Sequence, residues 1–175
     1  MHALIERARD GDADAFSAAI ENSLDRLYGA AYLVLRDRHA AEDAVQDGLL
    51  RAWRRLPTLR DAARFDAWVR RIVMHAAIDS ARRRRPTVEL GTEIEGPDTG
   101  GDLEARSVIG DAFGLLPPAH RAVLVLRYYL DLTVPEIAST LEVPEGTAKS
   151  RLHHATRRLR AVLAEIDPEL GVIRG

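Results

Sequence analysis

The 175-residue sequence contains no cysteine, which excludes a disulfide framework and thiolate metal sites and is typical of a reducing compartment. It also has no apolar run that approaches the roughly 20 residues needed to span a membrane. The first residues, MHALIERARDGDADAF, carry too many charges for a secretory signal peptide. From these absences we expect a cytoplasmic protein that does not insert into membranes.

Aromatic residues make up only 5% of the chain, although 46% of its residues are hydrophobic, so the core must be built mainly from Ala, Leu, Val and Ile. No segment alternates strictly between apolar and polar residues, as a half-buried strand would. Apolar residues instead recur at helical spacing within residues 24–35, 41–56 and 65–76, which predicts an all-α fold. Phe65 and Trp68 have two interpretations: platforms for stacking unpaired bases or, as helical spacing favours, core residues.

The sequence has no arrangement of residues that is typical of catalysis. Its six histidines are scattered, and the neighbours His153 and His154 cannot both face one metal ion, because helical ligand pairs are usually four residues apart. Acidic residues are numerous, but none stands beside a nucleophile or a glycine-rich phosphate loop. We therefore expect no enzymatic activity, no metal site and no cofactor.

What the sequence does have is a strong segregation of charge, hidden by a net charge of −2. Residues 51–85 contain eleven arginines and three aspartates, for a net charge of +8, whereas residues 86–112 carry a net charge of −6. The four consecutive arginines from Arg82 to Arg85 exceed what a helix C-terminus needs to complement its dipole. Contact with nucleic-acid phosphates is the better interpretation, and a solvated helix face is the alternative.

A glycine-rich segment, residues 87–102, separates two helical regions. It holds four glycines and one proline, it is acidic, and it shows little apolar periodicity. It predicts a flexible acidic linker between two small helical modules, residues 1–86 and residues 103–175. In the second module, apolar spacing predicts a helix from Pro118 to Leu130.

Residues 133–163 show the pattern of a helix-turn-helix. Thr133 and Glu136 have the T-x-x-E spacing of a capping box, and Pro144 suits the start of the second helix. Between the helices, Glu142 occupies the turn, where glycine would adopt a left-handed conformation without steric cost. The inward positions of the second helix recur at steps of four, three and four: Ala148, Leu152, Ala155 and Leu159.

The remaining faces of this second helix carry basic and hydroxyl side chains. They are candidates for contact with a DNA major groove: Thr147, Lys149, Ser150, Arg151, His153, His154 and Arg157. An αα-hairpin that only packs or dimerises is the alternative. The basic exposed face, the capping box and the turn together favour DNA binding.

The helix predicted before Pro57 carries an acidic face, formed by Asp43, Gln46 and Asp47 beside Leu50. An ordinary solvated face, in which an acidic residue pairs with an arginine four positions later, is one interpretation. Binding to a basic protein partner is the other, because an acidic surface on a DNA-binding protein must face away from phosphate.

Three segments in a fixed order resemble a known family: AEDAVQDGLLRAWRRL, FDAWVRRIVMHAAIDSARRRRP and LPPAHRAVLVLRYYLDLTVPEIASTLEVPEGTAKSRLHHATRRLR. They resemble the extracytoplasmic-function (ECF) group of bacterial RNA polymerase sigma factors, within the sigma-70 family. The resemblance covers residues 14–164 and implies the two modules called regions 2 and 4. It implies a factor that binds core RNA polymerase and directs initiation at promoters with −35 and −10 elements.

The resemblance also implies roles for particular residues. It implies contact with the clamp helices of the polymerase β′ subunit through Asp43, Gln46, Asp47 and Leu50. It implies recognition of the melted −10 element by the loop from Pro57 to Phe65 and the helix after it, through Arg64, Phe65, Arg70, Arg71, His75, Arg82 and Arg83. It places the second helix of the helix-turn-helix in the −35 major groove, and it adds the β flap and an anti-sigma factor as partners. His75 stands where the family commonly has Asn.

Two other functions stay open. A transcriptional regulator of the response-regulator type carries a similar helix-turn-helix in its output domain, but its receiver domain would show alternating β and α segments, which this sequence lacks. A protein-interaction adaptor that no longer reads DNA is the second alternative. The net charge of +8 in residues 51–85 disfavours this adaptor.

Overall fold

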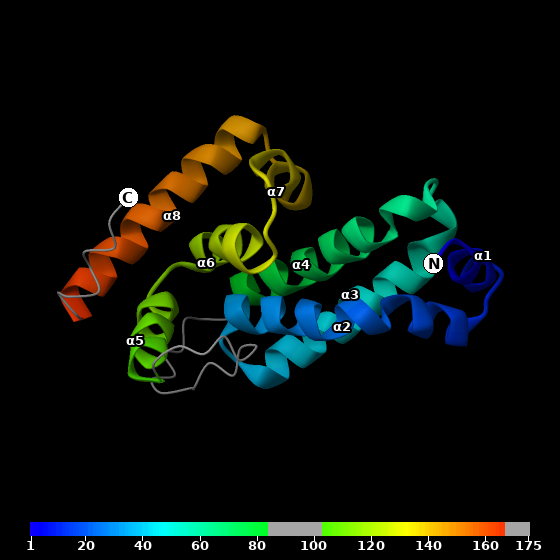
Figure 1. The fold of residues 1–175 in the computed structure, drawn as a ribbon, viewed down its shortest axis with the longest axis horizontal. Coiled ribbons are helices and arrows are strands. Elements are labelled where there is room, and N and C mark those ends of the chain that lie inside the picture. Colours follow the sequence, from blue (N-terminus) through cyan, green and yellow to red (C-terminus); the bar gives the residue numbers. More distant parts are fainter. Residues whose placement is uncertain (84–102, 167–175) are drawn as a thin grey trace. The chain divides into compact units, whose positions relative to one another are not determined.

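The computed structural model describes residues 1–83 and 103–166, whose secondary structure is helical without a strand. The all-α prediction is therefore confirmed. The chain divides into two compact units, Met1–Ala81 and Arg82–Gly175 (Figure 1). The acidic linker predicted over residues 87–102 lies outside the described residues.

The first unit contains four α-helices: α1 (His2–Arg9), α2 (Ala13–Leu35), α3 (Arg38–Arg55) and α4 (Phe65–Arg83). The three helices predicted from apolar spacing correspond to α2, α3 and α4. Two aspartates cap helix starts: the Ala15 amide donates to Asp12 Oδ1 over 3.0 Å, and the Ala40 amide donates to Asp37 Oδ1 over 2.8 Å. The sequence pattern did not predict α1, because this short, charged helix buries only Ile5 and Ala8.

Helices α3 and α4 approach each other unusually closely at Gly48. A Cβ atom built on Gly48 would lie 2.7 Å from the Cα atom of Val73 and 2.9 Å from its Cγ2 atom. No real Cβ atom tolerates such a distance to backbone. The absence of a side chain at Gly48 therefore sets the spacing of α3 and α4.

An aromatic cluster joins α2, α3 and the start of α4. The Phe16 ring meets the Trp53 ring edge-on at a centroid distance of 5.3 Å and the Phe65 ring at 6.0 Å. The Phe65 ring in turn lies 6.4 Å from the Trp68 ring. These contacts bring together the end of α3 and the beginning of α4, and so fix both ends of the segment that connects them.

The second unit contains α5 (Leu103–Gly114), α6 (Pro118–Leu124), α7 (Val134–Leu141) and α8 (Glu145–Ile166). The first three of these helices all pack against the long helix α8 (Figure 1). The helix predicted from Pro118 to Leu130 is not uniform, because α6 widens into a π-helical turn, η3 (Val125–Tyr129). The buried Arg121 fixes the approach to α6 by donating from Nη1 to the Leu116 carbonyl over 2.8 Å.

The predicted helix-turn-helix is present as α7 and α8. The Glu136 carboxylate accepts from the Thr133 amide over 2.8 Å, completing the capping box. Glu142 adopts a left-handed conformation, with φ 54° and ψ 46°, and the Val143 amide donates to the Ala138 carbonyl over 3.0 Å. The four positions of α8 predicted to face inward differ in burial: Ala148 and Ala155 are buried, whereas Leu152 and Leu159 are half-buried.

Candidate nucleic-acid and protein interfaces

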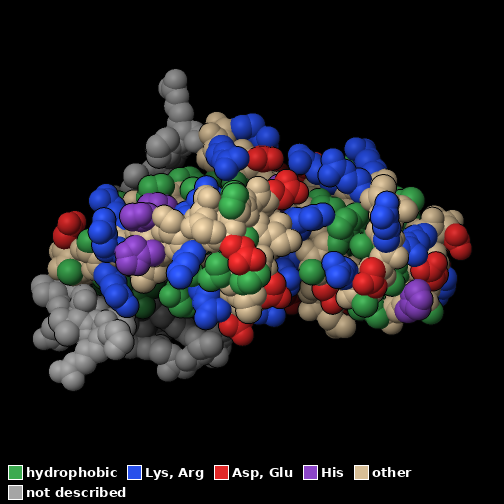
Figure 2. Space-filling view, turned by 90° about the horizontal axis from the view of Figure 1, so that it is seen from above, with side chains coloured by type: hydrophobic (Ala, Val, Ile, Leu, Met, Phe, Trp, Pro, Cys, Tyr) green, Lys and Arg blue, Asp and Glu red, His purple; other side chains and the backbone are tan. Residues whose placement is uncertain are grey.

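Helix α8 presents its predicted DNA-contacting side chains to solvent. Arg151 is half-buried, and the others are exposed: Thr147, Lys149, Ser150, His153, His154 and Arg157. Figure 2 shows Lys, Arg and His side chains gathered over α8. The inward apolar stripe faces α5, α6 and α7, so this surface is positioned by the same helical period that builds the core.

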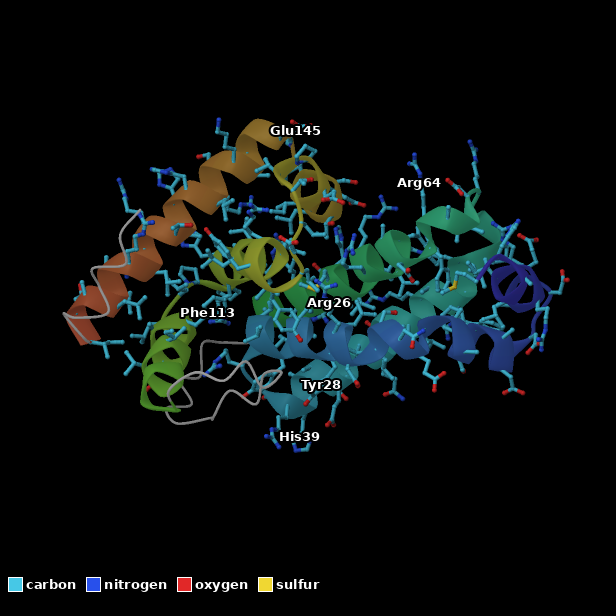
Figure 3. The ribbon with its side chains drawn as sticks, in the orientation of Figure 1. Arg26, Tyr28, His39, Arg64, Phe113 and Glu145 are labelled. Atoms are coloured by element: carbon cyan, nitrogen blue, oxygen red, sulfur yellow. The ribbon has the colours of Figure 1, made fainter. Side chains whose placement is uncertain are left out.

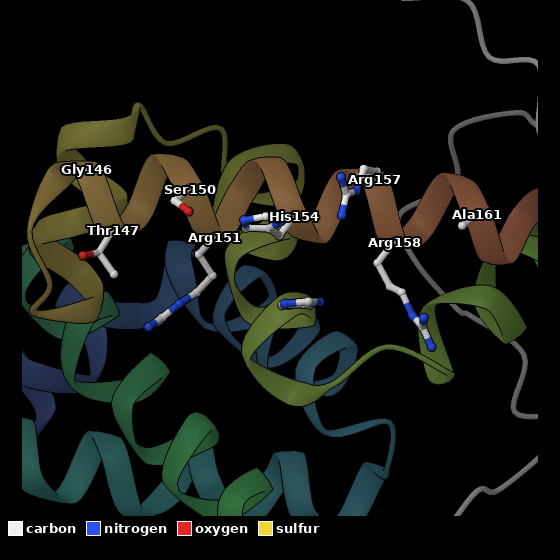
Figure 4. Close-up of a pocket in the computed structure, with 9 residues that line it drawn as sticks. Gly146, Thr147, Ser150, Arg151, His154, Arg157, Arg158 and Ala161 are labelled. Carbon is white, nitrogen blue, oxygen red and sulfur yellow. The ribbon is translucent and has the colours of Figure 1, made fainter.

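A groove with a volume of about 810 Å³ runs along α8 (Figure 4). Its lining includes five predicted contacts: Thr147, Ser150, Arg151, His154 and Arg157. The other four lining residues were not among the predicted contacts: His120, Gly146, Arg158 and Ala161. None of the nine lining residues is acidic. The groove therefore has the charge and the hydroxyl groups that suit a phosphate or a base edge.

His120, from α6, is the part of this groove that lies outside the helix-turn-helix. Burial lowers the pKa of His120 below its usual value, and the neighbouring His154, Arg151 and Arg158 lower it further. Its Nδ1 atom is buried without a hydrogen-bond partner among the described residues. An anion bound in the groove would offset the repulsion that the neighbouring positive charges exert on a protonated His120.

The acidic face predicted on α3 is also exposed. Asp43 and Gln46 are exposed, the Asp47 side chain is 46% exposed, and Leu50 is 45% exposed. Asp47 accepts from Arg51 Nη2 over 2.5 Å and from Nε over 3.2 Å, so the predicted i,i+4 ion pair is present. An exposed leucine beside carboxylates gives this face the mixed character of a protein-binding surface.

The connection between α3 and α4 contains two short 3₁₀ turns, η1 (Leu56–Thr58) and η2 (Ala62–Arg64). Asp61 begins η2 by accepting from the Ala63 amide over 3.0 Å. Arg64 Nε lies 3.5 Å from the Asp61 carboxylate, yet its side chain is 80% exposed and projects outward (Figure 3). This arginine is therefore accessible to a nucleic acid.

The predicted −10 contacts on α4 do not all share one face. Arg71, His75 and Arg82 recur at steps of four and seven, the spacing of a single helix face, whereas Arg70 lies about 100° around the helix from Arg71. Arg70, Arg71 and His75 are half-buried, and Arg82 and Arg83 are exposed at the helix end. A DNA-binding surface on α4 would therefore follow the face that carries Arg71, His75 and Arg82.

The structure corrects the prediction for Phe65. Its side chain is only 1% exposed and packs against the Phe16 and Trp68 rings, so it offers no surface to DNA. Of the two interpretations, the core position is the right one, because burying an aromatic ring at the start of α4 stabilises the fold.

No group of three or more His, Asp or Glu side chains within residues 1–83 and 103–166 could hold a metal ion. In the same part of the chain, no helix is both long and apolar enough to cross a membrane.

Two family models match the chain: "Sigma-70 region 2" matches residues 19–87, and "Sigma-70, region 4" matches residues 106–159. The ECF RNA polymerase sigma factor SigL of Mycobacterium tuberculosis is 37% identical over 95% of this chain and 99% of its own length. The ECF RNA polymerase sigma factor SigW of Bacillus subtilis is 29% identical over 93% of this chain and 96% of its own length.

Two solved structures have a similar fold. CnrH, in complex with the cytosolic domain of CnrY, matches with a TM-score of 0.69 and 25% identity, over 93% of this chain and 96% of CnrH. RpoE of Bartonella quintana, in complex with the anti-sigma factor NepR, matches in fold with a TM-score of 0.70 and 23% identity, over 91% of this chain and 98% of RpoE.

Proposed function

Because this chain belongs to the ECF RNA polymerase sigma factors, we propose that it binds core RNA polymerase through α3 and directs initiation by contacting promoter DNA through α4 and α8. The observation that carries this proposal is the basic, hydroxyl-bearing outer face of α8 within a helix-turn-helix. We assign residues 1–86 to core and −10 binding and residues 103–175 to −35 binding.

Recognition of the −35 element follows from the shape of α8. A helix fits the major groove, where each base pair presents its own pattern of donors and acceptors. Lys149, Ser150, His153 and His154 would reach base edges, and arginines further along α8 would meet phosphates, since these side chains are exposed on one helix. Phosphate contacts set the register, and base contacts supply the sequence preference.

Recognition of the −10 element requires single-stranded DNA. Opening the duplex costs stacking and pairing energy, and binding the released bases offsets that cost without a cofactor. The exposed Arg64 in the connecting loop, with Arg71 and His75 on α4, would hold the melted strand and its phosphates. The exposed Arg82 and Arg83 would extend this contact along the backbone.

Two protein partners complete the proposal. The acidic face of α3, with Leu50 beside it, would bind the clamp helices of the β′ subunit, and the second unit would contact the β flap. Since RpoE of Bartonella quintana is solved in complex with an anti-sigma factor, we also propose such a regulator for this chain.

The direct test is run-off transcription with core RNA polymerase and fragmented genomic DNA. We expect discrete transcripts that depend on adding this protein, and mapping their 5′ ends identifies the promoters. A response-regulator-type activator would instead give transcripts only when another sigma factor is also present. Absence of transcripts when this protein is the only factor added to core enzyme would overturn the proposed function.

Truncating the base-reading side chains should weaken promoter binding. We expect Lys149→Ala combined with Ser150→Ala to lower affinity for −35 duplex by at least about 30-fold, because each good base or phosphate contact is worth about 1–3 kcal/mol and two are removed. Fluorescence anisotropy with labelled duplex measures this change. Arg7→Ala, which removes a similar charge from α1, is the control and should bind normally; equal binding by both variants would exclude α8 as the reading helix.

Promoter binding should strengthen as the pH falls from 7.5 to 6. The lowered pKa keeps His120 neutral near pH 7, and a phosphate in the groove favours its charged form. We expect a gain of at most about fivefold, since a unit charge beside a phosphate contributes on the order of 1 kcal/mol in water and the lowered pKa leaves His120 only partly protonated at pH 6. His120→Gln should reduce this gain, whereas a pH profile identical to that of the wild type would remove His120 from the interface.

The same lowered pKa has an opposite effect on folding. Because the folded state binds the His120 proton less well than the unfolded state, His120 makes the second unit less stable as the pH falls through the ordinary histidine range. Unfolding curves at each pH are therefore needed beside the binding curves, so that affinity is measured only where the protein stays folded.

A further inference from the structure

Helix α1 reaches the loop that connects α3 and α4. The Arg9 side chain donates a hydrogen bond from Nη2 to the main-chain carbonyl of Leu59, which lies 50 positions further along the chain. Helix α1 also packs against both η1 and η2, the two short turns of this loop. Arg9 lies before residue 19, where the match to the region 2 model begins.

Leu59 is the point at which this loop is attached to the rest of the first unit. It is the only buried residue between Pro57 and Arg64, all of which the structure describes, and it is 6% exposed. Its amide donates to the Leu56 carbonyl over 3.0 Å, and its carbonyl accepts from Arg9. The apolar side chain and the carbonyl of Leu59 thus anchor an otherwise largely exposed loop.

The surroundings of Arg9 hold its guanidinium in place. Arg9 Nη1 pairs with Glu6 Oε1 over 2.5 Å one turn earlier on α1, and the Arg9 side chain is only 22% exposed. Arg7, on the same helix, is 62% exposed and pairs with Asp12 over 2.6 Å. The two arginines therefore differ in their contacts: Arg9 contacts the loop, and Arg7 forms a surface ion pair.

We infer that Arg9 is a positioning residue for −10 recognition, which holds Leu59 so that the exposed residues of the loop are preorganised to bind melted DNA. The inference rests on the proposed function of this loop. A loop that is already ordered loses less conformational entropy when it captures a base than a loop that must be ordered by the DNA. Arg9 acts through the carbonyl of Leu59 and need not touch DNA itself.

The test compares Arg9→Met with Arg7→Met, which remove the same charge from the same helix. A fork-junction DNA with a single-stranded −10 element, taken from a promoter found by run-off transcription, is bound to the holoenzyme carrying each variant. We expect Arg9→Met to lower affinity for this DNA about tenfold and Arg7→Met to leave it unchanged. Arg9→Lys, which keeps a donor for the carbonyl, should recover part of the loss.

Two further measurements separate positioning from simple loss of structure. Affinity for core polymerase and for −35 duplex should be the same in Arg9→Met and wild type; a parallel loss in all three would overturn the inference. Amide hydrogen exchange of residues 57–64 should become faster in Arg9→Met than in Arg7→Met, and it requires no promoter. If no promoter is found, the proposed function fails, while unchanged exchange would refute the Arg9 contact independently.

Discussion

Reversing the charges of Asp43 and Asp47 is expected to lower affinity for core RNA polymerase by at least 100-fold. Charge reversal replaces attraction by repulsion at a basic partner surface, and like-charge contacts across an interface cost several kcal/mol. The pair Asp43→Arg and Asp47→Arg leaves Leu50 in place, so the loss would report on charge alone. Binding is measured by anisotropy of labelled protein titrated with core enzyme.

The fold should survive this change, because both side chains lie on the outer face of α3. The Asp47–Arg51 pair is partly exposed, and such pairs contribute at most about 1 kcal/mol to stability. Glu21→Arg with Asp25→Arg is the matched control, since these exposed carboxylates on α2 have the same i,i+4 spacing. Core binding that is lost equally in both double variants would indicate a general charge effect and contradict a specific site on α3.

The sequence predicted the features that a single helix determines. The inward positions of α8 follow from its period, and the opposite face is exposed as a consequence, so the −35 candidates could be named without a structure. The same reasoning placed Asp43, Gln46 and Leu50 on one face of α3. In both cases one periodic pattern decides burial and exposure together.

Features that depend on contacts between helices were not predictable in this way. Phe65 has the spacing of a core residue and also the chemistry of a base-stacking residue, and only its contact with Phe16 decides between them. His120 joins the groove because α6 packs against α8. Arg9 meets Leu59 across 50 positions of sequence, in a helix too short to give a strong periodic signal.

Gly48→Ala should destabilise the first unit, although alanine is the better helix former. Helix propensity alone would favour alanine by about 1 kcal/mol. The new Cβ atom, however, would lie 2.7 Å from the Val73 Cα atom, and backbone cannot move aside as a flexible side chain can. Overpacking usually costs about 1–3 kcal/mol. After the gain in helix propensity is subtracted, we expect a net loss of up to about 2 kcal/mol.

Gly146→Ala is the matched control, because Gly146 also lies in a helix but a Cβ atom there would meet nothing within 4 Å. Alanine at Gly146 should therefore stabilise the second unit by about 0.5–1 kcal/mol. Both tryptophans, Trp53 and Trp68, belong to the first unit, so their fluorescence in urea titrations follows that unit, while circular dichroism follows both. A Gly48→Ala protein as stable as wild type would show that separating α3 from α4 costs no more than the gain of about 1 kcal/mol that helix propensity contributes.

The Gly48 contact also connects stability with polymerase binding. Gly48 lies next to Asp47 and two residues before Leu50, so a helix displaced from α4 carries the acidic face with it. We expect Gly48→Ala to weaken core binding even at temperatures where the first unit stays folded, because a rigid interface depends on the placement of its side chains. Core affinity that is unchanged under those conditions would mean that α3 binds its partner independently of its packing on α4.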